Sequence, residues 1–221
     1  MTIDRRLLLG LGVVLFSLSA GGPVRADDGD DVRIRWDIIR LSPGPAINAG
    51  GEASAKATNA STSQTETSTL TMTGSGTFEV PEKDRRPAQG RPRRDEEGDD
   101  VTGGGTWMIT TGAVSSLGTY KVTGVVLWVE APGTVPITDN IGNAADARAG
   151  LAVLRIEYSD GERGILVVSC SFVGTPNTVF EGITASKGFT DFWKAQPPTG
   201  TPTTPNANRT LFHVVRDDDD N

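Results

Sequence analysis

The chain has almost none of the residues that build metal sites and disulfides. Among its 221 residues there is one cysteine, Cys170, and one histidine, His213. A single cysteine cannot form an intrachain disulfide, and a zinc site needs several His or Cys ligands. The sequence therefore predicts no metal ion, no cofactor, and a fold that its hydrophobic core holds together.

The 21 lysines and arginines are outnumbered by 28 aspartates and glutamates, which gives a formal net charge of −7. Residues 1–26 contain Arg5 and Arg6, then an apolar run and a small-residue end, which is the pattern of a secretory signal peptide. The apolar run is too short to favour a membrane span. Loss of the three arginines and one aspartate of this segment would leave residues 27–221 near −9. We therefore expect an exported protein, periplasmic or extracellular, that repels nucleic acid.

No long stretch has the periodicity of an amphipathic helix. The best candidate is residues 143–150, an alanine-rich run that ends in Gly150 and allows about two turns. Apolar and polar side chains instead alternate strictly in residues 32–38, with Asp37 on the polar face, and in residues 69–80. Such alternation is typical of antiparallel strands with one buried and one solvated face.

Two hairpins are indicated late in the chain. The pair Asp160-Gly161 separates two apolar runs, and such a pair provides the backbone conformation of a tight turn. Gly188 follows Ser186 and Lys187 and predicts a second turn, between a strand on either side of it.

Together these features predict a single all-β domain, an antiparallel barrel or sandwich of about 8–10 strands with at most one short helix. Residues 51–58 are expected to form an edge strand and residues 209–215 the last strand. The charged segment 81–100 has no aliphatic residue larger than alanine, which predicts a disordered insertion. The acidic residues 217–221 are expected to form a solvated tail.

A Gly-Thr-aromatic triplet ends at Phe78, at Trp107 and at Tyr120. We expect the glycines to leave room for neighbouring rings, and the aromatic side chains to share one inner face. If the interior is a cavity, four aromatic side chains would line a site for a small apolar ligand: Trp36, Trp107, Tyr120 and Trp128. If the interior is filled, these side chains are core packing.

Candidate catalytic groups are few, and each has a simpler interpretation. Cys170 and His213 could form a nucleophile–base pair, but Cys170 shares a strand face with apolar residues, as a buried thiol would. Glu181 and Asp191 could form an acid–base pair, but carboxylates in so acidic a chain are mostly solvated. Glu181 is the unusual one, because the other residues on its strand face are apolar.

Residues 103–122, GGGTWMITTGAVSSLGTYKV, resemble the opening of the avidin–calycin barrels, in which Gly-x-Trp begins one strand and Gly-Thr-Tyr lies on the next. The later tryptophan-rich strands of avidins have no counterpart in this chain, so the resemblance does not imply biotin binding. Residues 146–193 resemble a group of exported bacterial proteins of uncharacterised function, and that resemblance implies no activity.

Three hypotheses for the function remain open. The first is a non-enzymatic binding or interaction module outside the cytoplasm, for a small apolar ligand or a protein partner. The second is a small hydrolase or isomerase with an aromatic-lined barrel site and carboxylate chemistry at Glu181 or Asp191. The third is a structural or surface-associated protein whose threonine-rich outer faces keep it in solution. A closed barrel with an inner cavity larger than a few waters, holding a buried carboxylate or His213, would favour a bound ligand or an enzyme, and a fully packed interior would exclude both.

Overall fold

The structure is a computed structural model, and it describes residues 32–42, 44–59, 61–80, 101–200 and 207–215. The predicted signal peptide (1–26), insertion (81–100) and acidic tail (217–221) lie outside the described residues, so these three expectations stay predictions.

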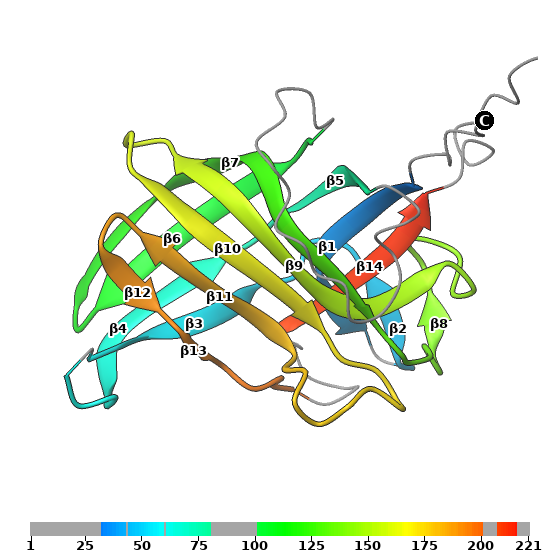
Figure 1. The fold of residues 1–221 in the computed structure, drawn as a ribbon. Helices are drawn as coiled ribbons and strands as arrows, with labels where there is room; N and C mark the ends of the chain where they lie inside the picture. Colours follow the sequence, from blue (N-terminus) through cyan, green and yellow to red (C-terminus); the bar gives the residue numbers. More distant parts are fainter. Residues whose placement is uncertain (1–31, 43, 60, 81–100, 201–206, 216–221) are drawn as a thin grey trace, which may run out of the picture.

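The described part of the chain contains strands and no helix. The strands close into an antiparallel barrel with extra strands at its margins (Figure 1). The ring of paired neighbours is β1–β5–β6–β7–β9–β14, and β14 returns to β1. The strands are β1 (Val32–Ser42), β2 (Ala46–Asn48), β3 (Ala53–Thr58), β4 (Thr65–Met72), β5 (Ser75–Val80), β6 (Gly104–Thr111), β7 (Val114–Ala131), β8 (Thr138–Asp139), β9 (Ala147–Tyr158), β10 (Arg163–Cys170), β11 (Gly182–Lys187), β12 (Thr190–Phe192), β13 (Lys194–Ala195) and β14 (Arg209–Val215). The prediction of an all-β antiparallel fold is confirmed, and the barrel alternative is the one observed.

The alternating run 69–80 is divided into β4 and β5, which both pair with β6 but have different neighbours on the other edge. β4 pairs with β3, and β5 pairs with β1. The chain bends between them at Gly74, whose φ of 149° is one that residues other than glycine rarely adopt. The predicted inner face is retained through the bend, since Leu70, Met72 and Phe78 are all fully buried.

The long strand β7 closes the barrel by pairing with β6 and then with β9. Its register against β9 shifts twice, after Val122 and after Val125. Each shift reverses the order of inward and outward side chains, so two shifts restore it. Tyr120 and Trp128 therefore both point into the barrel, where they are 5% and 6% exposed.

The three Gly-Thr-aromatic triplets place their rings in the core, as predicted. A Cβ on Gly118 would come within 2.8 Å of Nε1 of Trp107, and one on Gly76 within 2.9 Å of Nε1 of Trp36. At these two positions glycine leaves the room that a neighbouring ring occupies.

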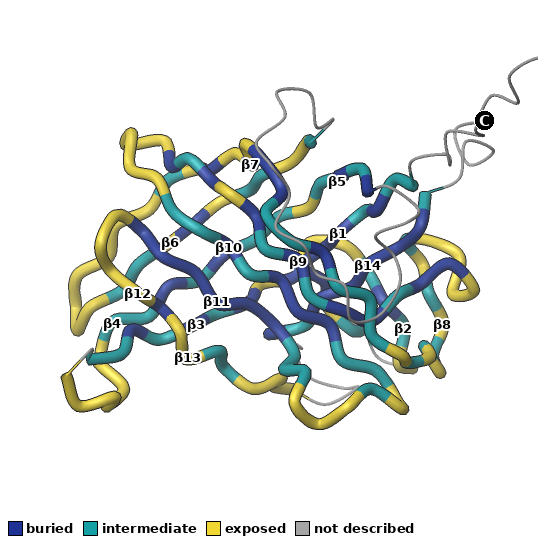
Figure 2. The backbone as a smooth tube through the Cα atoms, in the orientation of Figure 1, coloured by how far each residue is buried: buried dark blue, intermediate teal, exposed yellow. Residues whose placement is uncertain are grey.

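Both predicted hairpins form. β9 and β10 pair across the turn at Asp160-Gly161, and Gly161 has the positive φ, 90°. β11 and β12 pair across the turn at Gly188, with a φ of 57°. These turns lie with the β3–β4 and β6–β7 turns at one end of the barrel, on the left of Figure 1, and β2 and β8 lie at the other end. Figure 2 shows that exposed residues concentrate in the turns and buried ones along the strands.

Three local expectations need correction. The candidate helix 143–150 is a turn followed by the start of β9, because Ala147 pairs with His213 of β14. Two turns of helix are too few to outweigh that pairing. Residues 51–58 are not an edge, since β3 has β4 on one side and the short β13 on the other. Asp37, expected on a wet face, is only 2% exposed.

The burial of Asp37 has a visible cause. Its carboxylate accepts a hydrogen bond of 2.8 Å from Nη2 of Arg35, and Nη1 of Arg35 donates to the carbonyl of Ile141 at 2.9 Å. Arg35 thus links the outer face of β1 to the segment before β9. Burial raises the pKa of Asp37 despite the arginine.

The described residues include no helix that is long and apolar enough to cross a membrane.

We expect Gly118→Ala to lower the free energy of unfolding by about 1–3 kcal/mol, because the new Cβ would lie 2.5 Å from Oγ of Ser159 and 2.8 Å from Nε1 of Trp107. Gly124→Ala in the same strand is the matched control, since its Cβ would meet only the side chain of Arg155, at 3.4 Å. Urea denaturation of the three proteins measures both changes. Equal destabilisation by the two substitutions would contradict close packing at Gly118.

Candidate functional site

The candidate site lies at a fork, where two strands share one edge of β9. β10 pairs with β9 as far as Cys170, which lies opposite Gly150. β14 then pairs with β9 through Phe212, which lies opposite Arg148. Backbone groups at such a fork need acceptors other than the shared strand.

The carboxylate of Glu181 spans this fork. Its Oε2 accepts a hydrogen bond of 2.6 Å from the backbone N–H of Ser171, just beyond β10. Its Oε1 accepts one of 2.7 Å from the N–H of Thr210 in β14. The hydroxyl of Thr210 donates to the carbonyl of Ser169 at 2.6 Å, which is a second link between the two strands. The Glu181 side chain therefore links the end of β10 to β14 through hydrogen bonds.

An apolar pocket of about 430 Å³ opens beside Glu181; we call it the Glu181 pocket. Its polar groups are Glu181, Arg209, Thr210 and Ser171. Most of its remaining wall is aliphatic or aromatic, and includes Ile39, Leu41, Ile47, Val135, Ile137 and Phe172. A pocket of this size and lining suits a small apolar molecule with one polar end.

Burial raises the pKa of Glu181 to about 7. The backbone hydrogen bonds from Ser171 and Thr210 and the positive charge of Arg209 act in the opposite direction, and burial outweighs them. The residue as a whole is only partly buried, while its carboxylate lies deep enough to titrate near neutral pH. The sequence placed Glu181 on a strand face, whereas β11 begins only at Gly182, so the residue precedes the strand; its carboxyl group is nevertheless unusual.

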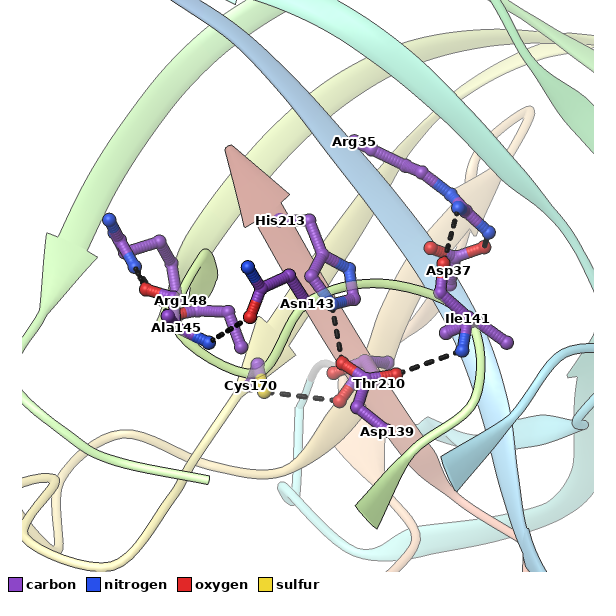
Figure 3. Close-up of polar contacts among 11 residues, drawn as sticks. Arg35, Asp37, Asp139, Ile141, Asn143, Ala145, Arg148, Cys170, Thr210 and His213 are labelled. Carbon is purple, nitrogen blue, oxygen red and sulfur yellow. Dashed lines mark hydrogen bonds and ion pairs between the residues drawn. The ribbon is translucent and has the colours of Figure 1, made fainter. Parts of the chain in front are cut away.

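Cys170 and His213, the candidate nucleophile–base pair, have different hydrogen-bond partners. Cys170 is fully buried, its Sγ lies 3.0 Å from the carbonyl of Thr210, and burial raises the pKa of its thiol well above the usual value. A thiol in that state is a poor nucleophile. His213 is bonded through Nε2 to Oδ2 of Asp139 at 2.6 Å (Figure 3).

Asp191 does not accompany Glu181. It is exposed and lies on β12, opposite Ser186 of β11. Ser186 of β11 is five residues from Glu181, which directly precedes that strand, and five residues of extended chain span about 16 Å. A glycosidase pair needs carboxyl groups about 5–10 Å apart, so these two residues do not form one.

The four aromatic candidates for an internal ligand site are buried, and Trp107, Tyr120 and Trp128 lie against other rings. Trp128 packs against Phe212 with ring centroids 4.6 Å apart, and Trp107 packs against Tyr158 at 5.7 Å. The indole nitrogens of Trp36 and Trp128 are buried without a hydrogen-bond partner in the described part of the chain, so packing in the hydrophobic core holds these side chains. The Glu181 pocket is lined by none of the four.

Lys187 closes the hairpin end of the barrel. It is 8% exposed, and its ammonium lies 4.8 Å from the ring centroid of Trp107 and 5.1 Å from that of Tyr158. Asp160 and Glu162 both accept hydrogen bonds from it. Burial by itself would lower the pKa of Lys187, but the two carboxylates raise it overall. With these partners the residue is a structural cation, not a general base.

Three parts of this arrangement have no counterpart in the sequence analysis: Asp139, Arg209 and the apolar wall of the pocket. Asp139 and His213 are 74 positions apart, and Asp139 lies in a segment without periodicity. Among the described residues no group of three or more His, Cys, Asp or Glu side chains could hold a metal ion.

Comparison with protein-family models, with curated proteins and with solved structures found no match for this chain. The resemblance of residues 103–122 to the avidin–calycin opening therefore stays a prediction.

Glu181 should make the stability of the protein depend on pH. Its pKa is about 7 in the folded state against an ordinary 4.5, so between these pH values the folded protein binds more protons than the unfolded chain. The free energy of unfolding should then fall as pH rises through this window, by about 3 kcal/mol from this group. Urea denaturation across the window, for the wild type and Glu181→Gln, isolates the contribution.

The stability of the wild type relative to Glu181→Gln should decrease from pH 4.5 to pH 7 and then stay constant. A difference that grows with pH would mean that the backbone donors of Ser171 and Thr210 outweigh burial, and would overturn this account of the site.

Proposed function

We propose that this protein is a non-enzymatic binding module, exported from the cytoplasm, whose Glu181 pocket takes a small apolar ligand with a hydrogen-bonding end. The observation that carries the proposal is the combination of an apolar pocket of about 430 Å³ with one buried carboxyl group at its wall. Sites for small molecules commonly combine apolar walls with few polar groups in this way. Export rests on the signal-peptide pattern of residues 1–26 alone.

The polar end of the ligand follows from the chemistry of Glu181. Oε1 accepts from the N–H of Thr210 and, at 3.4 Å, from its hydroxyl, whereas Oε2 accepts from the N–H of Ser171 and has a lone pair left. A hydroxyl or amine on the ligand could donate to that lone pair. An amine would in addition favour the ionised form of Glu181, so its binding should strengthen as pH rises toward neutrality.

A thermal-shift screen with apolar alcohols and amines tests the proposal, because a ligand that binds the folded state raises the melting temperature. Val135→Trp should fill the pocket and abolish the shift. Val114→Trp is the matched control, since Val114 is 73% exposed at the start of β7 and should leave the shift unchanged. An equal shift in both variants would place binding elsewhere and overturn the proposal.

A second candidate function is a small hydrolase or isomerase that uses Glu181 as a general acid or base. It is favoured by one observation, the pKa of about 7, because proton transfer is most efficient when the group titrates near the working pH. Asp191 has no part in this version, since it lies on β12, opposite Ser186 at the far end of β11 from the pocket.

Mass spectrometry of a ligand found in the screen, before and after incubation with the protein, separates the two functions. Recovery of unchanged ligand supports the binding module. Conversion by the wild type, with binding kept and conversion lost in Glu181→Gln, would instead show an enzyme.

A further inference from the structure

A second pocket, of about 570 Å³, lies on the outer face of β1 and β14 under the segment before β9. We call it the His213 pocket, and it goes beyond the function proposed above. His213 and Arg35 lie directly opposite each other on the two strands, and Arg33 lies two residues along β1. All three line the pocket, together with Thr77, Asn143 and Asp146.

The imidazole of His213 is held in one orientation. Nε2 of His213 lies 2.6 Å from Oδ2 of Asp139, whose Oδ1 accepts from the N–H of Ile141 at 3.0 Å, and we assign the ring hydrogen to Nε2 because a carboxylate is an acceptor (Figure 3). Gly142 lies close to the ring, since a Cβ there would be 2.5 Å from Nε2. Because the carboxylate accepts the hydrogen of Nε2, the neutral ring carries its lone pair on Nδ1.

That lone pair has no protein partner. His213 is only 4% exposed, and Nδ1 is buried with no hydrogen-bond partner among the described residues. A buried polar atom without a partner is costly and rare in folded proteins. A group that lines a pocket, is fixed by a second residue and presents one acceptor is suited to receive a hydrogen from a ligand.

Two arginines line the pocket: Arg35 is hydrogen-bonded within the protein, and Arg33 is accessible. Arg35 donates to both Ile141 and Asp37, which fixes it to the protein. The Arg33 side chain is 42% exposed and makes a loose contact of 3.4 Å with Glu79. Its guanidinium therefore has donors left for an oxyanion, which arginine binds well.

The charge of the pocket limits which oxyanion fits. Asp146 lines the same pocket and is 6% exposed, so a fully deprotonated dianion would meet a carboxylate as well as Arg33. A ligand that keeps a hydroxyl hydrogen avoids part of this repulsion and can use the acceptor of His213.

We propose that the His213 pocket binds a small oxyanion that carries its own hydroxyl group, of the hydrogen phosphate or short hydroxycarboxylate type. The guanidinium of Arg33 binds the anionic oxygens, and the hydroxyl donates its hydrogen to Nδ1 of His213. Both ligand types share this chemistry, and the experiment distinguishes them.

Nitrogen-15 NMR tests the proposal directly, because His213 is the one histidine of the chain and its ring signals need no assignment. Phosphate is compared with sulfate, and glycolate with acetate, at matched ionic strength and neutral pH. Phosphate or glycolate should shift the Nδ1 signal in a saturable way, while sulfate and acetate, which lack the hydroxyl hydrogen, should not. The ligand that shifts it identifies the type.

Arg33→Gln should weaken the binding about tenfold or more, the effect expected when a charge-assisted hydrogen bond is lost. Arg40→Gln is the matched control, since Arg40 lies on the same strand, is exposed and does not line the pocket. An Nδ1 signal that no ligand moves, an equal response to sulfate and phosphate, or equal weakening by the two substitutions would each overturn the proposal.

Discussion

The pairing of β9 with three neighbours is the constraint on which the rest of the structure depends. β7 follows one edge of β9, and β10 and β14 follow the other edge in succession. Closure through β14 and β1 removes the inward rings from water, which is the main source of stability in a chain without disulfides. The same closure requires a fork between β10 and β14, and the fork leaves amide groups that the shared strand does not satisfy.

The polar chemistry of the molecule lies where strands part or are covered, not at the centre of the barrel. At the fork, Glu181 gives acceptors to two backbone amides and also lines an apolar pocket. On the outer face of β14, Asp139 and Gly142 cover His213 and fix its ring. In both places a polar group that first serves the fold also lines a pocket, and its remaining lone pair is what the proposed ligand would use.

Much of the fold could be predicted, because strand alternation and turn residues are local properties. The inner face of residues 69–80, the turn at Gly161 and the last strand follow from sequence patterns and agree with the structure. Glu181 could be singled out, since a carboxylate on an apolar strand face is unexpected. Asp37 was assigned to the wrong environment, because alternation shows which face a side chain shares but not whether another segment covers that face.

The sequence by itself determined the all-β class, the strand faces, the hairpins and the positions where a ring displaces all side chains but glycine. Each of these depends on residues a few positions apart, which is the range over which backbone and side-chain sterics act. The tertiary structure alone decided that the sheet closes, that Glu181 spans two strands and that Asp139 meets His213. Those contacts join residues 10 or more positions apart, and a local pattern does not specify which distant edge a strand will pair with.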